Sequence, residues 1–345
     1  MLSRTLYTRK TKKSEGSRSQ SHNADDEDCL VGLAGDLPLN ICRSGGYYDG
    51  GDPHIRTPVK VASLYLREVL MSSVQVMGES GLGISEKVVL PNQGVYASKR
   101  FRNVTVSRKE FGRRVEKLVQ VSKGNEYLVQ VRGYLYAKRI KFVLCDYYPM
   151  GSLADLLDGT RILGHTPLDW NKRLKIILHV ARAIAFIHGQ CRSQDKNLQL
   201  NIHGNIKSSN VLLKMNFSAC LSEYGFIQLA EEPSEDFGVW KQQSLKKTNL
   251  TEKMSQKNDI HSYGMMVLDI LGGPKASTQI SCILERKKEI KEGVYVFFEC
   301  LVEGKGRMQA FQVLELALAC VNKSHEARPS IDKILAFLGD NLCIG

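Results

Sequence analysis

A short polar loop carries the residues of this sequence that are best suited to chemistry. The stretch IHGNIKSSNVLL, residues 202–213, places His203, Asn205, Lys207 and Asn210 before an apolar run. A lysine can contact a phosphate group, and an asparagine can bind a hard cation such as Mg²⁺ through its amide oxygen. This pattern is typical of a phosphotransferase catalytic loop. Asn205 stands where a general base is expected, and an amide does not accept a proton near pH 7.

The segments that would position this loop change from predicted strands to predicted helices along the chain. From about residue 61 to residue 147, apolar or alternating segments separated by turn residues predict about five β-strands. Two helices are predicted among them, a short one over residues 61–70 and one over residues 107–121. After Gly151 the pattern is helical, and residues 167–189 carry an apolar face at helical spacing. A β-rich part followed by a helical part predicts an α+β architecture with two lobes.

These segments resemble a protein kinase domain, and in particular the cytoplasmic part of plant leucine-rich-repeat receptor-like kinases. The resemblance covers about residues 63–338 in the family's order and rests on LYLREVLMSSVQVMGESGLG, YASKRF, DYYPMGSLADLL, PLDWNKRLKIILHVARAIAFIH, HGNIKSSNVLL, SQKNDIHSYG and ARPSIDKI. It implies a two-lobed protein kinase-like fold, with an N-lobe of about residues 61–147 and a C-lobe of about residues 148–340. Residues 1–60 mix a basic start with an acidic run and are predicted to be a disordered, juxtamembrane-like tail.

The resemblance implies a site for the phosphates of a nucleotide in the N-lobe. Gly78 and Gly83 match the first and third glycines of the family's GxGxxG loop, whereas Ser80 holds the middle position. A Cβ at that position crowds the approach of the backbone to phosphate. Lys99 matches the strand lysine that holds the α- and β-phosphates, and Glu116 matches its ion-pair partner on the following helix.

The segment that links the two lobes is implied to hold the adenine. Asp146 and Tyr147 match positions whose backbone faces the base, and are predicted to contact the nucleotide in this way. Cys145 matches the gatekeeper position and is smaller than the usual Tyr or Met, so a roomier back pocket is expected. A buried cysteine of this kind is expected to be an ordinary thiol and not a reactive one.

The catalytic and metal-binding positions of the family are altered in this chain. Asn205 replaces the aspartate that accepts a proton from the substrate hydroxyl, and general-base assistance is typically worth about 10²–10⁴ in rate. Lys207 matches the phosphate-contacting lysine, and Asn210 matches one magnesium ligand. Glu223, in Ser-Glu-Tyr-Gly, replaces the other metal-binding aspartate with a longer side chain. Because magnesium demands near-ideal octahedral geometry, the expected outcomes are weak magnesium–ATP binding, metal-free nucleotide binding or no nucleotide binding.

Other positions of the resemblance concern the scaffold. Asp259 matches the buried aspartate that holds the backbone of the catalytic loop. The motif that closes the activation segment has its nearest match at residues 242–244 and lacks its glutamate. Arg328, which would pair with that glutamate, is therefore expected to find another carboxylate. Four parts of the phosphotransfer machinery are thus altered, while the positions that support the fold are kept.

Composition narrows the functional classes. Nine cysteines with no CxxC spacing argue against a disulfide framework and a zinc site, and no apolar run approaches the ~18 residues of a membrane span. The net charge is +12, and nearly all of the excess lies after residue 60. A dense basic stretch, residues 99–117, predicts either a solvated basic face or a docking surface for an acidic partner, a lipid surface or a polyanion.

Taken together, these features predict a pseudokinase that acts as a signalling scaffold or allosteric partner and retains at most weak ATP binding. A slow but active Ser/Thr kinase is the alternative, since positioning and electrostatics supply most phosphoryl-transfer catalysis. Polyanion binding is a remote alternative, because no recognised nucleic-acid motif is present. The expected partners are other protein kinases or receptor complexes. The expected location is cytoplasmic, with the basic N-terminal cluster facing an anionic membrane surface.

Overall fold

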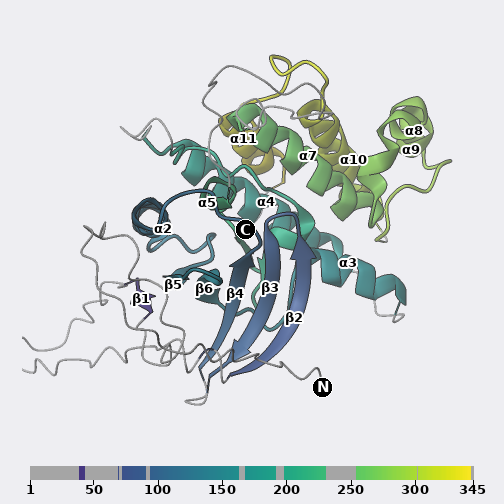
Figure 1. Ribbon diagram of the computed structural model, residues 1–345. Helices are drawn as coiled ribbons and strands as arrows, with labels where there is room; N and C mark the ends of the chain where they lie inside the picture. Colours follow the sequence, from purple (N-terminus) through teal and green to yellow (C-terminus); the bar gives the residue numbers. More distant parts are fainter. Residues whose placement is uncertain are drawn as a thin grey trace, which may run out of the picture.

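The computed structural model describes residues 39–42, 69, 72–90, 94–162, 168–191, 198–230, 254–300 and 302–342. An antiparallel sheet forms one part of the fold and a group of helices forms the other (Figure 1). The strands are β1 (Asn40–Ile41), β2 (Ser73–Ser80), β3 (Gly83–Val89), β4 (Val95–Phe101), β5 (Val131–Tyr136), β6 (Lys141–Asp146), β7 (Val211–Leu213) and β8 (Ala219–Leu221). The predicted α+β architecture with two lobes is confirmed.

The main sheet has six strands in the order β1-β5-β6-β4-β3-β2, and all of its pairs are antiparallel. Its register places Ser85 of β3 opposite Lys99 of β4, and places Val143 of β6 on the other side of Lys99. Residues on opposite strands at one register position have neighbouring side chains on one face. The sheet thereby sets the surroundings of Lys99.

Strand β1 is a difference from the sequence prediction. Residues 1–60 are predicted to lack regular structure, yet Asn40 and Ile41 pair with Tyr134 and Gly133 of β5, and Leu39 beside them is buried. The strand adds its backbone hydrogen bonds to an otherwise open edge of the sheet. The rest of the predicted tail lies outside the described residues, as does all but Val69 of the short helix predicted over residues 61–70.

Helix α2 (Arg108–Ser122) confirms the helix predicted between the strands. Ser107 caps its N-terminus by accepting a hydrogen bond from the backbone N–H of Glu110 at 3.3 Å. Phe111, Val115 and Leu118 recur at helical spacing and are buried. This apolar stripe packs the helix against β5, next to the cleft between the lobes.

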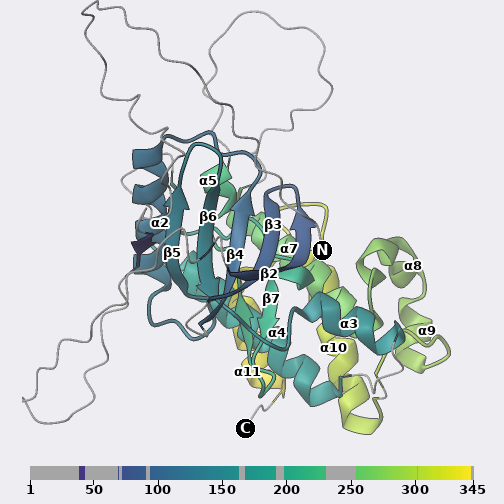
Figure 2. The same ribbon diagram turned by 60° about the horizontal axis from the view of Figure 1, so that its bottom comes forward.

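The helical part forms around α4, whose predicted apolar face is buried along its whole length. The helices are α3 (Leu153–Ile162), α4 (Trp170–His188), α5 (Ile227–Ala230), α7 (Gln256–Gly272), α8 (Ile280–Glu285), α9 (Lys287–Glu292), α10 (Gly304–Cys320) and α11 (Ile331–Leu342), with 3-10 turns η2 (Ser208–Asn210) and η3 (Ala276–Gln279). Figures 1 and 2 show α8 and α9 at the end of this part that lies farthest from the sheet. None of the helices in the described ranges is long and apolar enough to cross a bilayer.

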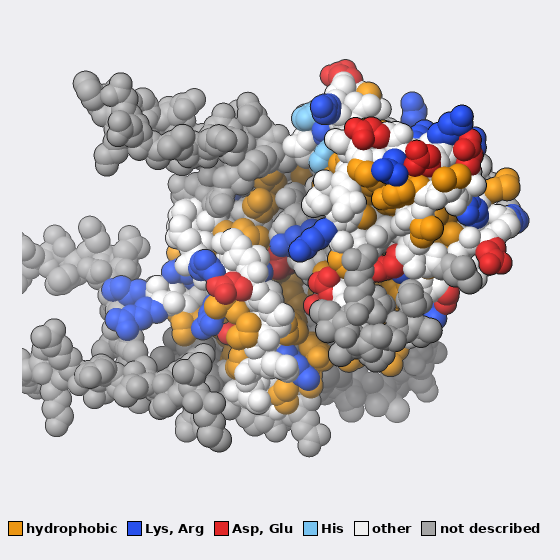
Figure 3. Space-filling view, turned by 90° about the vertical axis from the view of Figure 1, so that its right-hand side faces the viewer, with side chains coloured by type: hydrophobic (Ala, Val, Ile, Leu, Met, Phe, Trp, Pro, Cys, Tyr) orange, Lys and Arg blue, Asp and Glu red, His pale blue; other side chains and the backbone are white. Residues whose placement is uncertain are grey.

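Five of the eight basic residues in the stretch over residues 99–117 are paired with carboxylates of the fold. Lys99 is buried, Arg100 pairs with Glu86 at 2.8 Å, and Arg102 pairs with Glu79. Two further arginines of the stretch, 113 and 114, both pair with the carboxylate at position 110. On the face drawn in Figure 3, Lys/Arg and Asp/Glu side chains are likewise intermixed. Much of this positive charge is therefore compensated within the fold, which weakens its interpretation as a docking surface.

Candidate functional site

A cavity of about 180 Å³ lies between the sheet and the helical part, at the place that the sequence predicts for a nucleotide. Seven of the ten predicted site residues line it: Gly78, Lys99, Asp146, Tyr147, Lys207, Asn210 and Glu223. Among the described residues, the lining does not include the other three, which are Gly83, Glu116 and Asn205. The sequence prediction thus locates the cleft, whereas the contacts inside it differ from those expected.

The ammonium group of Lys99 is fully engaged by protein atoms. Its Nζ lies 2.7 Å from Oε1 of Glu223, and donates hydrogen bonds to the hydroxyls of Ser80 at 3.0 Å and Ser85 at 3.2 Å. An ammonium group has three N–H donors. All three are therefore used, in a setting where the side chains of Lys99 and Glu223 are only 6% and 9% exposed.

The ion pair predicted between Lys99 and Glu116 is wrong in this structure. Glu116 is an exposed residue of α2, and its Oε1 accepts a hydrogen bond from the hydroxyl of Tyr134 at 2.8 Å. Lys99 instead pairs with Glu223, which follows β8. The glutamate at position 223 carries its carboxylate one methylene farther from the backbone than an aspartate would.

Glu223 also binds the two asparagines of the polar loop. Its Oε2 accepts a hydrogen bond from Nδ2 of Asn205 at 2.8 Å and a longer one from Nδ2 of Asn210 at 3.4 Å. Nδ2 of Asn210 also donates to the backbone carbonyl of Asn205 at 2.8 Å. Because that acceptor is a carbonyl, the amide nitrogen of Asn210 must face Glu223. Lys99, Glu223, Asn205 and Asn210 thus form one closed network, in which both carboxylate oxygens have partners.

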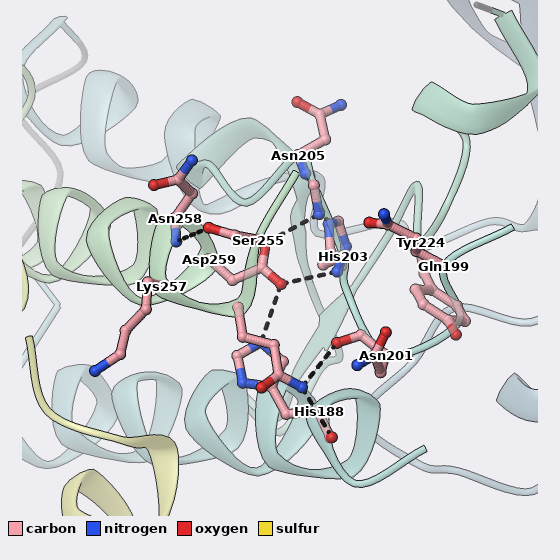
Figure 4. Close-up of polar contacts among 12 residues, drawn as sticks. His188, Gln199, Asn201, His203, Asn205, Tyr224, Ser255, Lys257, Asn258 and Asp259 are labelled. Atoms are coloured by element: carbon pink, nitrogen blue, oxygen red, sulfur yellow. Dashed lines mark hydrogen bonds and ion pairs between the residues drawn. The ribbon is translucent and has the colours of Figure 1, made fainter. Parts of the chain in front are cut away.

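Asp259 of α7 holds the backbone of the polar loop through hydrogen bonds (Figure 4). Oδ2 of Asp259 accepts hydrogen bonds from the backbone N–H of His203 at 2.8 Å and from Nε2 of His188 at 3.0 Å. Oδ1 accepts from the backbone N–H of Gly204 at 2.9 Å. These contacts confirm the scaffold role predicted for Asp259, which is almost completely buried.

His203 links this scaffold to the segment that carries Glu223. Its Nδ1 accepts a hydrogen bond from the backbone N–H of Asn205 at 3.1 Å, so the ring proton lies on Nε2, which donates to the carbonyl of Ser222 at 3.0 Å. The ring is fully buried, and this burial lowers the pKa of His203 below its usual 6.5. The imidazole is therefore a neutral bridge between the two loops.

Acid is expected to destabilise the fold in part through His203. In the unfolded chain the imidazole takes up a proton as the pH falls through about 6.5, whereas the folded chain resists this uptake. The unfolded state then binds more protons, so the free energy of unfolding falls as the pH falls, by at most about 1.4 kcal/mol per pH unit for one group. NMR of the histidine ring protons measures the titration midpoint of His203. The midpoint in the folded chain should lie well below the midpoint in the urea-unfolded chain. An equal midpoint in both states would contradict it.

A carboxylate at position 205 is expected to make the fold dependent on Mg²⁺. The substitution Asn205→Asp replaces a donor with an anion at 2.8 Å from Glu223, and two carboxylates so close cannot both ionise without a cation between them. In EDTA, we expect the free energy of unfolding of the variant to be roughly 2–3 kcal/mol lower than that of the wild type. Millimolar MgCl₂ should restore part of this loss. Urea unfolding under both conditions is the measurement.

The matched control for this experiment is Asn205→Ala. It removes the same hydrogen bond to Glu223 without adding a charge, so its stability should be the same in EDTA and in MgCl₂. A stability of the Asn205→Asp variant that does not respond to Mg²⁺ would show that the two side chains do not share one site.

The segment between the lobes is rigidly attached to the sheet. Asp146 forms a bidentate ion pair with Arg132, at 2.5 and 2.8 Å, and its backbone N–H donates to the carbonyl of Gln130 at 3.0 Å. Lys87 lies over the ring of Tyr147 at 4.8 Å from its centroid. Burial raises the pKa of the Cys145 thiol, which keeps it protonated and agrees with the expectation of an ordinary thiol.

The glycine-rich loop is a tight hairpin between β2 and β3. A Cβ added to Gly78 would have no heavy atom within 4 Å, whereas a Cβ added to Gly83, at φ +150°, would lie 2.0 Å from the carbonyl oxygen of Arg100. Glu79, in the same loop, forms an exposed ion pair with Arg102. Gly83 therefore serves the pairing of β3 with β4, in addition to any role in binding.

Helix α2 contacts residues 225–228, where the activation segment begins. Arg114, a buried residue, donates a hydrogen bond from Nη1 to the carbonyl of Gln228 in α5 at 2.5 Å. Gly225 lies so close to the helix that an added Cβ would be 2.4 Å from a methyl group of Leu118. The closing motif predicted at residues 242–244 lies outside the described residues.

Among the described residues, Arg328 contacts no carboxylate of the kind that the sequence predicts. Its guanidinium donates to the backbone carbonyls of Asn322 at 2.9 Å and Lys257 at 3.0 Å, and to the side-chain oxygen of Asn258 at 3.1 Å. A guanidinium presents a fixed fork of donors that three such oxygens can satisfy. Arg328 therefore joins α7 to the segment before α11 through backbone and amide oxygens.

Sequence reasoning missed two side chains that define the site. Ser85 holds Lys99, and Tyr134 holds Glu116. Ser85 could be found from the β3–β4 register, in which it lies opposite Lys99, but the connection over residues 90–94 does not specify that register from sequence. No local signal indicates Tyr134, because its contact depends on how α2 packs on β5.

Comparison with known proteins agrees with the fold and the site. The protein kinase domain family matches residues 71–337. The relatives from Arabidopsis thaliana include "Probable inactive receptor kinase At3g08680", 29% identical over 78% of this chain and 43% of the relative, and "Probable leucine-rich repeat receptor-like protein kinase At1g68400", 40% identical over 60% of this chain and 30% of the relative. The chain thus spans less than half the length of these curated relatives.

Two solved structures share the fold. The pseudokinase domain of BIR2, an immune regulator of the RLK/Pelle family, matches with a TM-score of 0.65 and 21% identity, over 89% of this chain and 88% of that one. The kinase domain of maize SIRK1, solved bound to AMP-PNP, matches with a TM-score of 0.63 and 22% identity, over 81% of this chain and 96% of that one. With the family match over most of its length, the chain belongs to the protein kinase family.

Proposed function

We propose that the protein is a pseudokinase of the plant receptor-like type, which acts by binding a protein kinase or a receptor complex and not by transferring phosphate. One observation carries the proposal: the position of the family's general base, Asn205, and the position of its metal-binding carboxylate, Glu223, are hydrogen-bonded to each other at 2.8 Å. The two altered positions therefore compensate each other within one network. Several relatives are named inactive receptor kinases, which supports the same conclusion.

The arrangement around Glu223 does not fit a magnesium–ATP complex. A metal ion would need the carboxylate oxygens that now bind Lys99, Asn205 and Asn210. In the described ranges, no three His, Cys, Asp or Glu side chains gather into an alternative metal site. Without a metal, the charge that develops on a transferred phosphoryl group loses its main stabilisation. Weak ATP binding and a doubtful Mg²⁺ site are accordingly part of the proposal.

Phosphate transfer is the decisive measurement for this function. The full chain should transfer no radiolabel from γ-labelled ATP to itself or to a general substrate protein above the level of a Lys99→Met variant. Turnover near 1 s⁻¹, the low end for kinases, that is lost in Lys99→Met would overturn the proposal. It would instead establish the slow Ser/Thr kinase that remains the alternative.

A membrane-facing location is the second part of the proposal. The N-terminal cluster MLSRTLYTRKTKK carries five Lys/Arg residues, and each one near an anionic leaflet contributes about 1 kcal/mol. The cluster lies outside the described residues. Co-sedimentation with phosphatidylserine vesicles should detect this binding and its loss in high salt. Equal binding to uncharged vesicles would contradict it.

A further inference from the structure

Within the proposed pseudokinase, on which this inference rests, we propose that the cleft prefers an uncharged adenine-like ligand, such as a nucleoside, over ATP. Glu223 acts as a built-in anion, and its carboxylate takes the lysine that the family uses for phosphate. The class of ligand then follows from the donors, charges and apolar surface that the cavity still offers.

The phosphate end of the cavity offers few donors. All three N–H groups of Lys99 are used, by Glu223 and the hydroxyls of Ser80 and Ser85. A phosphate that replaced Glu223 would leave a buried carboxylate without its cation, which is strongly unfavourable. Within the described part of the chain, Lys207 is the one lining lysine that forms no ion pair or hydrogen bond.

The charge of the cavity lining is also unfavourable for a triphosphate. Four carboxylates, from Glu79, Asp146, Asp155 and Glu223, line the cavity together with the ammonium groups of Lys99 and Lys207. Arginines outside the lining neutralise two of these carboxylates, Arg102 at Glu79 and Arg132 at Asp146. The cleft is therefore close to neutral overall, whereas a nucleoside triphosphate brings several negative charges.

The opposite end of the cavity suits a neutral, planar ligand. Ala97, Val129, Cys145 and Leu212 supply apolar surface, and Asp146 and Tyr147 add polar residues to the lining beside Cys145. Binding sites for small molecules typically combine apolar walls with a few polar groups of this kind. An uncharged ligand can use this end without disturbing the network of Glu223.

Isothermal titration calorimetry of the full chain tests the preference directly. The probes are adenosine, ATP in EDTA and ATP with MgCl₂. We expect adenosine to bind at least about tenfold more tightly than ATP under either condition, which is about 1.4 kcal/mol. Mg²⁺ should not improve ATP binding.

A variant then tests the assigned cause. Glu223→Gln removes the built-in anion, so the affinity for metal-free ATP should rise about tenfold relative to the affinity for adenosine. Adding Lys99→Met to the Glu223→Gln variant should remove this gain. The matched control is Glu289→Gln, the same chemical change at an exposed carboxylate of α9 that pairs with Arg286 and does not line the cavity. It should change the ratio of the two affinities by less than about threefold, because exposed pairs are screened.

The outcomes separate this inference from the proposed function. Tighter binding of magnesium–ATP than of adenosine to the wild-type chain would overturn the inference, as would an absence of binding by any probe at millimolar concentration. In both cases a lack of phosphate transfer would leave the pseudokinase proposal standing. An adenosine preference that Glu223→Gln does not change would also overturn the inference, because Glu223 would not be its cause.

Discussion

Replacing Gly83 with alanine is expected to lower the free energy of unfolding by roughly 3–5 kcal/mol. The new Cβ would lie 2.0 Å from the carbonyl oxygen of Arg100 and 2.9 Å from its carbonyl carbon, and both atoms belong to the backbone of β4. Neither can move without parting β3 from β4. Overpacking typically costs about 1–3 kcal/mol, and the φ of +150° adds backbone strain of about 1–3 kcal/mol. Urea unfolding followed by circular dichroism is the measurement.

Gly81, in the same hairpin, provides the matched control. A Cβ there would have no heavy atom within 4 Å, so Gly81→Ala should change the stability by less than about 1 kcal/mol in either direction. Equal stabilities of the two variants would refute the structural role of Gly83. If the hairpin itself needs Gly83, the presence of this glycine does not show that the loop binds phosphate.

Replacing Asp259 with alanine is expected to lower the free energy of unfolding by roughly 3–5 kcal/mol, about as much as Gly83→Ala. The substitution leaves three donors without their acceptor: the buried backbone N–H of His203, the half-buried backbone N–H of Gly204, and Nε2 of His188. Each unsatisfied buried donor costs about 1–3 kcal/mol. Because the carboxylate holds the loop that carries Asn205, the network around Glu223 should loosen as well.

Two measurements check this expectation. Urea unfolding should show the lower stability, and the amide protons of His203 and Gly204 should exchange faster with solvent than in the wild type. Asp158, an exposed aspartate of α3, gives the control, because Asp158→Ala should stay within about 0.5 kcal/mol of the wild type. Slow exchange at His203 and Gly204 in Asp259→Ala would mean that other atoms hold the loop.

The elements of the fold could be predicted from sequence because their signals are local. The apolar face of α4 repeats at helical spacing, and Asp169 before it accepts a hydrogen bond from the backbone N–H of Lys172 at 2.9 Å. The stripe of Phe111, Val115 and Leu118 predicted α2 in the same way. Strand β1 was missed because two residues carry no periodicity.

The site could be predicted only as a set of residues, and not as a set of contacts. Spacing placed Lys99, Lys207, Asn210 and Glu223 in one cleft, where the structure has them. The resemblance to kinases implied Glu116 as the partner of Lys99, whereas the structure pairs Lys99 with Glu223. Side chains 124 positions apart in the chain meet only through the packing of the lobes, which no local pattern describes.

The sequence by itself determined the fold and the loss of the general base, since hydrophobic periodicity and the chemistry of an amide are properties of the residues alone. The tertiary structure decided where each charge in the cleft finds its partner. Lys99 has three donors and Glu223 two oxygens, and their pairing depends on distances of 2.7–3.4 Å across segments from both lobes. Electrostatic and hydrogen-bond energies change steeply over such distances, so the character of the cleft is set by the folded arrangement.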